Sequence, residues 1–417
     1  MSIGRRIITT FILLYLVLTI KAQTSITLKQ AISAAKEKNP FLKTESFNVA
    51  IAQADIITAK LRPNPILNNQ SLQLMNPSYF FPNTGFSNGH NRQVWWQLTK
   101  SFQMPALRKY KLEVAEQGVK FAQKNYAETE RNLFLNVGSN WVDAWYAKVS
   151  LDLIKKAQIN IDSLVYINEL RLKKQVITTT DLTRTQLLAE QYKLQIKSAE
   201  QEYRNQLQNL KFLLGTTDSV NIDANDNFTS VPLSNKIDSL LSYAVTSRAD
   251  VQTAQSTVDV AKSNIGLQKA IAKPTPELGV IYNPQNTIPY LGFYGTLPLP
   301  VFSRNQGEIQ KSKILQAQAE QNILVIQQQI KTEITTSYNS FQTQKQNVDK
   351  FKTIMLQSEQ ILTSVKYAYL KGGTTIIDFL EAQRTWFDTQ KMYYDALYNY
   401  RKSYVQLLYA TGLINQL

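Results

Sequence analysis

Proline divides this chain more sharply than any other residue does. The 13 prolines lie at position 40, between 63 and 105, at 232, and between 274 and 300. The stretches 106–231 and 301–417 are therefore free of proline, which would break a helix interior. Glycine is rare in both, and Ala, Leu, Lys, Gln and Glu dominate, the residues that lose least freedom in a helix. Both stretches predict long helices.

The apolar spacing in these stretches supports that prediction. A stripe that steps by three or four residues is typical of a helix, and one such stripe comprises Ile323, Ile326, Ile330, Ile334, Tyr338 and Phe341. As one helix, a stretch such as 305–370 would be about 100 Å long, at roughly 1.5 Å per residue. Long helices with narrow apolar stripes usually pack as coiled coils.

The chain also resembles itself. Ala59, Pro63 and Pro65 recur 211 residues later as Ala270, Pro274 and Pro276, and further on the offset becomes 197. At that offset Asp181, Leu182, Gln186, Tyr203, Leu210 and Gly215 match Asp378, Phe379, Gln383, Tyr400, Leu407 and Gly412. A register held at fixed offset indicates a duplication. We expect two copies, 23–215 and 237–417, each ordered helix, strand, strand, long helix, turn, helix, with the polar segment 216–236 as a linker.

Each copy contains a proline-bounded window with strand periodicity. Apolar residues occupy one face of 92–102 and one face of 290–299, and the lipid-facing candidates are Val94, Trp96, Leu98, Leu291, Phe293 and Leu297. About ten residues suffice for a tilted strand to cross a bilayer. Alternation alone fits a strand of a soluble sandwich equally well. Two further strands are expected at 66–75 and 276–283, the first mainly from its place in the repeat.

Four strands cannot close a membrane barrel, since the smallest single-chain barrels have eight. Open edges in lipid would leave backbone polar groups without partners. The sequence therefore predicts a barrel shared with further copies of the chain, two giving eight strands and three giving twelve.

The first 22 residues are typical of a secretory signal peptide. Arg5 and Arg6 precede an apolar run from Ile7 to Ile20, and Ala22 offers a small residue for cleavage. A permanent anchor is the alternative, but the run falls short of the roughly 20 residues that a spanning helix needs.

The composition provides few of the side chains that enzymes commonly use for catalysis. The chain has no cysteine and a single histidine, His90, within the predicted loop 76–91. Disulfides and thiolate sites are excluded, and a histidine zinc site or a Ser-His-Asp triad is disfavoured. No phosphate-binding loop occurs. We predict no catalytic, cofactor or metal site. The net charge is +15, but the basic residues are scattered along the chain, which fits solvated helix faces better than nucleic-acid binding.

The two expected turns between long helices lie at 173–181 and 371–378. Gly372 and Gly373 suit a tight turn, whereas the first copy has Gln175 and Val176 there, so we expect that turn to be built differently. After each turn comes a Thr, two residues and an Asp, ending at Asp181 and Asp378. The pattern predicts a capping box.

Three motifs resemble those of a known family: LRPNP at 61–65, FSRNQGEI at 302–309 and YLKGGTTIIDFLEAQRT at 369–385. The chain is similar to the outer-membrane efflux proteins, of which TolC is the namesake. That resemblance implies a mainly α fold with membrane β-structure: a trimer whose twelve strands form an outer-membrane barrel, continued into the periplasm by a coiled-coil barrel of long helices. The lack of cysteine departs from the many relatives with a lipid anchor.

The resemblance also implies a function and partners. The chain is expected to be a passive export duct and not an enzyme, working with outer-membrane lipid, a periplasmic adaptor and an inner-membrane pump. The adaptor would dock at the turns, at Lys173, Lys174, Gln175, Lys371, Gly372 and Gly373. Asp181 and Asp378, repeated threefold, would form carboxylate rings that gate the entrance, and the same residues can also cap their helices. A periplasmic adaptor and a structural coiled-coil envelope protein are the alternatives, which the duplicated strand pairs disfavour. The cargo, whether metal, drug or protein, is left open.

Overall fold

The computed structural model describes residues 24–417 except 227, 229–230, 232, 235 and 285–287. The predicted signal peptide at 1–22 lies outside these residues. The chain forms two compact units. Unit 1 comprises Met1–Glu45, Ala127–Ala249 and Gln327–Leu417, and unit 2 comprises Ser46–Tyr126 and Asp250–Ile326. Each unit thus takes residues from both of the predicted sequence copies.

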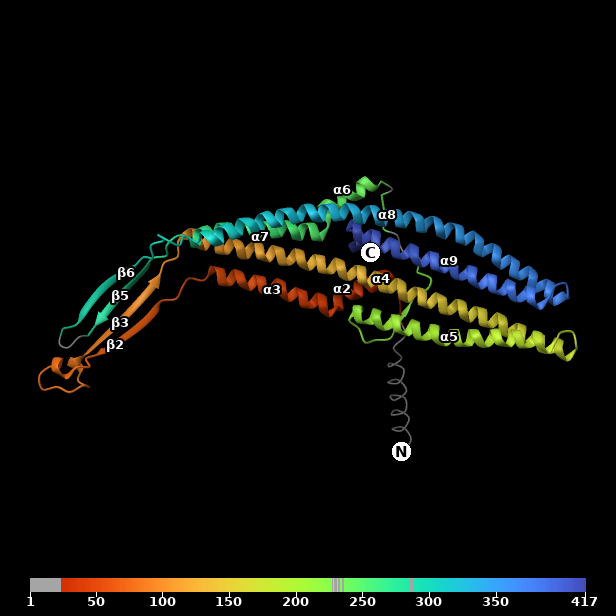
Figure 1. Cartoon of the computed structure of the whole chain (residues 1–417), viewed down its shortest axis with the longest axis horizontal. Helices are drawn as coiled ribbons and strands as arrows, with labels where there is room; N and C mark the ends of the chain where they lie inside the picture. Colours follow the sequence, from red (N-terminus) through yellow and green to blue (C-terminus); the bar gives the residue numbers. More distant parts are fainter. Residues whose placement is uncertain (1–23, 227, 229–230, 232, 235, 285–287) are drawn as a thin grey trace, which may run out of the picture. The chain divides into compact units, whose positions relative to one another are not determined.

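Unit 2 contains a four-stranded antiparallel sheet, labelled in Figure 1. Its strands, in the order in which they pair, are β2 (Ile66–Gln73), β3 (Arg92–Ser101), β5 (Glu277–Asn283) and β6 (Tyr290–Thr296). All four lie in the windows that the sequence predicted. One predicted strand residue is wrong: Leu297 lies one residue beyond β6, because Pro298 and Pro300 cannot donate backbone hydrogen bonds to a sheet.

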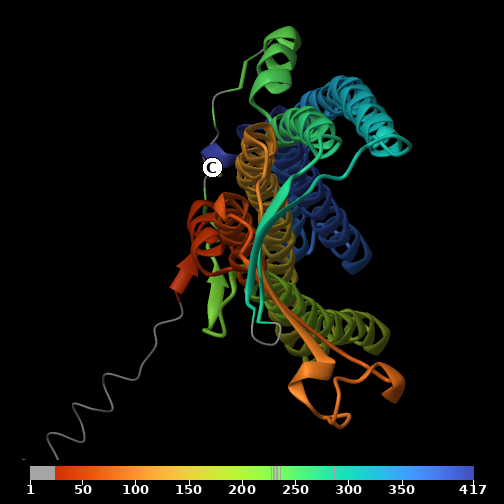
Figure 2. The ribbon, with the colours of Figure 1, turned by 90° about the vertical axis from the view of Figure 1, so that its left-hand side faces the viewer.

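The loop between β2 and β3 is held by its own side chains. It includes the short 3-10 helices η1 (Pro77–Tyr79) and η2 (Gly89–Asn91), and Figure 2 shows it at the ends of the two strands. Asn91 is buried, accepts a hydrogen bond from the Phe81 amide and donates to Thr84 and to the Gly85 carbonyl. The ring of His90 stacks on Phe81, so the lone histidine packs within the loop.

The two proline-free stretches each form two long helices joined by a turn, which confirms the helix prediction. The first contains α4 (Pro105–Lys173) and α5 (Thr179–Leu214), and the second contains α8 (Gln306–Lys371) and α9 (Ile376–Thr411). The helices that precede the strands are each divided in two. The first pair is α2 (Leu28–Lys38) and α3 (Pro40–Lys60), and the second is α6 (Ile237–Ser247) and α7 (Ala249–Ile271). Among described residues, no helix combines the length and apolar character that crossing a membrane requires.

The predicted linker 216–236 carries a strand of its own in unit 1. Strand β4 (Val220–Ile222) pairs in parallel with β1 (Thr24–Ile26). Trp141 of α4 donates its indole hydrogen bond to the Ile26 carbonyl at 3.1 Å, and Trp145 donates to the Ala224 carbonyl at 3.1 Å. The linker is therefore fixed to the long helices of this unit.

Candidate functional site

The two turns that join the long helices have the same backbone structure, although their sequences differ. Gln175 and Gly372, which align at the 197-residue offset, both adopt positive φ, of 57° and 80°. In each turn the next amide reaches back five residues, from Val176 to the Arg171 carbonyl and from Gly373 to the Ala368 carbonyl, both at 2.9 Å. This is the Schellman pattern of helix termination. The prediction that the first turn is built differently is wrong, because Gln175 adopts the left-handed conformation that glycine would have supplied.

A capping box follows each turn. Asp181 and Asp378 donate their backbone amides to Thr178 and Thr375, at 3.2 Å each, and their carboxylates accept the threonine amides in return. The capping interpretation is therefore confirmed at both turns. These bonds satisfy amide groups that the first helical turn leaves without partners.

The second cap has one donor more than the first. The Asp378 carboxylate accepts hydrogen bonds from the Thr375 hydroxyl and the Thr374 hydroxyl, each at 2.7 Å. These donors, Thr375 first, hold the pKa of Asp378 below its usual range. Asp378 is exposed, whereas Asp181 is half-buried and lies 4.0 Å from Arg184.

The structure brings the candidate docking residues together in two groups, one at each turn. All six are exposed: Lys173, Lys174, Gln175, Lys371, Gly372 and Gly373. The Lys371 ammonium lies 5.8 Å from the centroid of the Tyr367 ring. Each turn therefore presents a lysine and a backbone of the same shape to solvent.

A buried polar network joins the two hairpins close to their turns. The Tyr369 hydroxyl of α8 donates to the Asn168 side-chain oxygen of α4 at 2.6 Å, and Asn168 donates to Thr185 of α5 at 2.9 Å. Thr185 donates to the Asp181 carbonyl at 2.9 Å, and Arg171 donates to the Tyr369 carbonyl at 3.2 Å. Sequence reasoning missed this network, because an isolated Asn or Thr in a helical stripe gives no sign of its partner.

An apolar core around this network connects the same four helices. Its members are Leu153, Ala157, Ile161, Leu164, Ala189, Tyr192, Leu362, Tyr369, Ile376, Phe379, Ala382 and Trp386. Ile376 and Phe379 begin α9 immediately after the second turn. The turns are thus anchored by packing as well as by hydrogen bonds.

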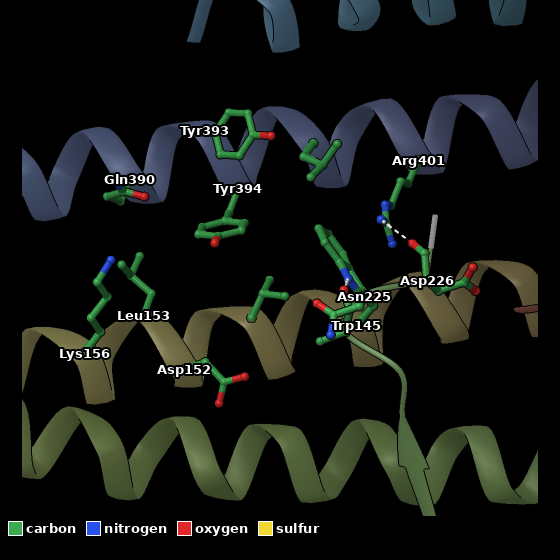
Figure 3. Close-up of a pocket in the computed structure, with 13 residues that line it drawn as sticks. Trp145, Asp152, Leu153, Lys156, Asn225, Asp226, Gln390, Tyr393, Tyr394 and Arg401 are labelled. Atoms are coloured by element: carbon green, nitrogen blue, oxygen red, sulfur yellow. Dashed lines mark hydrogen bonds between the residues drawn. The ribbon is translucent and has the colours of Figure 1, made fainter. Parts of the chain in front are cut away.

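A cavity of about 650 Å³ lies further along α4 and α9. Figure 3 shows Trp145 and Arg401 at one side of it, with the segment around Asp226 between them. The Arg401 guanidinium stacks 3.8 Å from the Trp145 ring centroid and donates to the Asp226 carbonyl at 3.1 Å. Burial lowers the pKa of Arg401 to about 10. Arg401, which no sequence motif marked, fixes the segment after β4 to the long helices.

One face of the sheet in unit 2 is apolar and exposed. The cross-strand rows place Leu67, Leu98, Val280 and Phe293 side by side, followed by Asn69, Trp96, Tyr282 and Leu291. Phe293 is 84% exposed and Leu291 is 71% exposed. The predicted lipid-facing residues therefore share one face, apart from Leu297. Val94, half-buried, belongs to the same alternating set on β3.

The opposite face of the sheet carries polar contacts. The Thr99 and Tyr294 hydroxyls are hydrogen-bonded to each other, and Ser101 donates to Glu277 at 2.8 Å. The Tyr294 ring covers Gly279, where a Cβ atom would lie 2.5 Å from the ring. Within the described residues, no group of three or more His, Cys, Asp or Glu side chains could hold a metal ion.

Several solved structures share this fold. CusC superposes with a TM-score of 0.76 and 19% identity, over 93% of this chain and 92% of that chain. The open state of the Neisseria gonorrhoeae MtrE outer membrane channel gives 0.74 and 16%, over 94% of both chains. The Campylobacter jejuni CmeC outer membrane channel gives 0.72 and 16%, over 94% and 89%.

Comparison of the sequence also finds outer-membrane proteins. TolC of Vibrio cholerae serotype O1 is 19% identical over 320 residues, 73% of either chain. TolC of Salmonella enteritidis is 24% identical over 123 residues, which are 28% of this chain and 24% of that protein. The family model described as "Outer membrane efflux protein" matches residues 240–413. Through residues 240–413 the chain is similar to this family. These matches support a channel of the outer membrane with a periplasmic helical domain, a transport protein of the TolC type and not an enzyme.

Proposed function

We propose that this efflux protein is a passive duct made of three copies of the chain, and that an adaptor and an inner-membrane pump open it at the helical turns. Three four-stranded sheets would make a twelve-stranded barrel in the outer membrane. The long helices would continue the duct through the periplasm. The observation that carries this proposal is the pair of open edges of the sheet.

Strands β2 and β6 are the two outer strands, each paired on one side only within the described sheet. They run in opposite directions, since each of the three pairings between them is antiparallel. β6 of one copy can therefore pair with β2 of the next in an antiparallel ladder. In a bilayer such pairing is required, because unpaired backbone groups in lipid cost several kcal/mol each. The resemblance to known ducts favours three copies over two.

The apolar face of the sheet supports a lipid-facing role for the residues that the sequence singled out. One cross-strand row contains Trp96, Tyr282 and Leu291. The next row on the same face contains Leu98, Val280 and Phe293. Exposed apolar area of this extent would disfavour a water-facing sheet. Leu297, exposed just beyond β6, would lie at the edge of the lipid band.

The turns would form the periplasmic entrance. Threefold repetition would place three copies of Asp378, and three of Asp181, around the opening, favouring cations over anions. The adaptor would contact Lys173, Lys174 and Gln175 at one turn and Lys371, Gly372 and Gly373 at the other. The shared backbone structure of the turns supports two equivalent docking positions in each copy.

Cysteine cross-linking tests the assembly, since the natural chain has no cysteine. Asn68→Cys on β2 would be combined in turn with a cysteine at Tyr290, Gly292 or Tyr294 on β6, because antiparallel pairing of the two strands permits several registers. Oxidation of one such pair should give cross-linked products that end at three chains, and each single variant should form none beyond a dimer. A series that ends at two chains, or one that continues past three, would contradict the proposal.

A further inference from the structure

We propose that the helix-proximal rim of the sheet binds the phosphate headgroups of anionic phospholipids through one cation at each strand–helix junction. These rim cations are Arg62, Lys100, Lys273 and Arg304. The inference rests on the proposed function, because it requires the sheet to lie in a membrane.

The rim cations recur at all four junctions between helices and strands. The junctions are 62–66 before β2, 100–105 after β3, 272–277 before β5 and 296–306 after β6, and each contains one Lys or Arg. The strand register brings the junctions to one end of the sheet, since Ser101 pairs with Glu277 and Glu277 with Thr296. Figure 1 shows all four strands joining their helices at this end.

The carboxylate at these junctions is kept away from the lipid face. Glu277 is the one acidic residue in the four segments. It lies in the row of Ser101 and accepts the hydroxyl of that serine at 2.8 Å, on the polar face of the sheet. Lys100 lies in the adjacent row, with Leu278 and Gly295, and so on the apolar face. An anion approaching from the lipid side therefore meets the ammonium group first.

The position of Lys100 matches the border of an apolar band. Arg92, Trp96, Leu98 and Lys100 alternate onto one face of β3, so the two cations bracket the apolar residues. Eight residues separate Arg92 from Lys100, a strand length of about 26 Å at roughly 3.3 Å per residue. At the tilt of about 40° usual in outer-membrane barrels, this length rises roughly 20 Å along the membrane normal, and the long side chains of Arg92 and Lys100 can reach the borders of an apolar band about 25 Å tall. A lysine at such a border extends its ammonium group into the headgroup layer.

The segment after β6 adds an apolar anchor beside its cation. Phe302 is 93% exposed, and Leu299 and Val301 are exposed as well. Arg304 donates from Nε to the Pro300 carbonyl at 3.2 Å, which closes the turn that presents Phe302. Asn305 ties the segment to α7 through the Gln268 carbonyl at 2.9 Å. An exposed aromatic ring next to a cation is a pattern suited to the membrane interface.

Tryptophan quenching by brominated lipids tests the inference. Trp95 and Trp96 lie in β3, and the other three tryptophans are buried in unit 1, where they contribute a constant unquenched signal. The full protein would be reconstituted in phosphatidylcholine vesicles in which one tenth of the lipid is brominated, either as phosphatidylglycerol or as phosphatidylcholine. Brominated phosphatidylglycerol should quench more, with a relative affinity on the order of fivefold.

Charge-neutral variants localise the effect. Lys100→Gln, Lys273→Gln and Arg304→Gln together, which leave Arg62 as the remaining rim cation, should lower the relative affinity most of the way toward one, and Lys100→Gln alone should lower it less. The control Lys345→Gln, Lys350→Gln, Lys352→Gln removes the same charge from an exposed part of α8 in unit 1 and should keep the preference. Trimer migration on unheated gels would verify folding of each variant.

Each outcome decides a different point. Equal quenching by the two lipids in the wild type would overturn the rim site and leave membrane insertion intact. An undiminished preference in the folded rim variants would overturn the assignment to these cations. If fully brominated phosphatidylcholine does not quench at all, the sheet does not lie in the bilayer, and the proposed function itself fails.

Discussion

The hydroxyl of Tyr369 donates a 2.6 Å hydrogen bond to the side-chain oxygen of Asn168, and this buried contact joins α8 to α4 near both turns. The two residues belong to different hairpins, so the bond resists separation of the turns. If an entrance opens there, this contact lies in the part of the molecule that has to move.

Removing the hydroxyl should loosen the turns. In Tyr369→Phe the Asn168 oxygen stays buried without that donor, which should cost about 1–3 kcal/mol of unfolding free energy. Urea unfolding of the purified protein measures the change, and single-channel recording should show more frequent open events. Tyr367→Phe is the matched control, because Tyr367 is exposed. If the two variants unfold at the same urea concentration and open equally often, the hydrogen bond does not hold the turns together.

The backbone conformation of the turns predicts opposite effects of exchanging their residues. Gly372→Gln places a side chain at φ 80°, where no neighbouring atom lies within 4 Å of the new Cβ, so the cost is backbone strain alone. We expect a loss of about 1–2 kcal/mol of stability. Gln175→Gly should be neutral or slightly stabilising, since relief of strain offsets the greater freedom of glycine when unfolded. Gly307→Ala, inside α8 and equally free of contacts, should not destabilise.

The lowered pKa of Asp378 gives its cap a defined pH dependence. The folded-state pKa lies below the usual 3.8, so the stabilisation is fully present above the unfolded value and is lost as pH falls through the folded value. Asp378→Asn should therefore lower the urea midpoint at pH 7 and have a smaller effect at pH 3. Glu381→Gln, an exposed change three residues further along α9, should show no such dependence. A constant difference at both pH values would rule out the ionised cap.

The contact between Tyr294 and Gly279 predicts a glycine requirement in the sheet. Gly279→Ala would put a methyl group into the Tyr294 ring, which is also held by its hydrogen bond to Thr99. Overpacking of this kind costs about 1–3 kcal/mol. The folded form on unheated gels should unfold at a lower temperature than the wild type. Gly292→Ala, where a Cβ atom meets nothing within 4 Å, should behave as the wild type.

The spacing of apolar residues and the positions of the prolines were enough to predict the helices and strands of this fold. Proline-free stretches predicted the long helices, and the 197-residue offset predicted that Asp181 and Asp378 hold equivalent caps. Pro298 could have placed the end of β6 before Leu297, but the alternation continued past it and dominated the prediction.

Two features depended on information that a local pattern does not carry. The sequence predicts a tight turn only where glycine is present, at Gly372. In the first turn, hydrogen bonds and the cap hold Gln175 in the same left-handed conformation. The contacts of Asn168 with Thr185 and Tyr369 span three helices, and Arg401 finds its carbonyl partner in the linker. Tertiary packing brings such partners together. A local sequence pattern relates only residues within a few helical turns of one another, so it does not reveal them.

The most direct test of the central claim is planar-bilayer conductance of the purified mature protein. Wild type would be compared with Asp378→Ala and with the double variant Asp181→Ala, Asp378→Ala. A trimeric duct with carboxylates at its entrance should give small cation-selective currents that grow and lose selectivity in the variants. Unchanged currents would reduce both aspartates to helix caps, and no current from any well-folded form would contradict the duct.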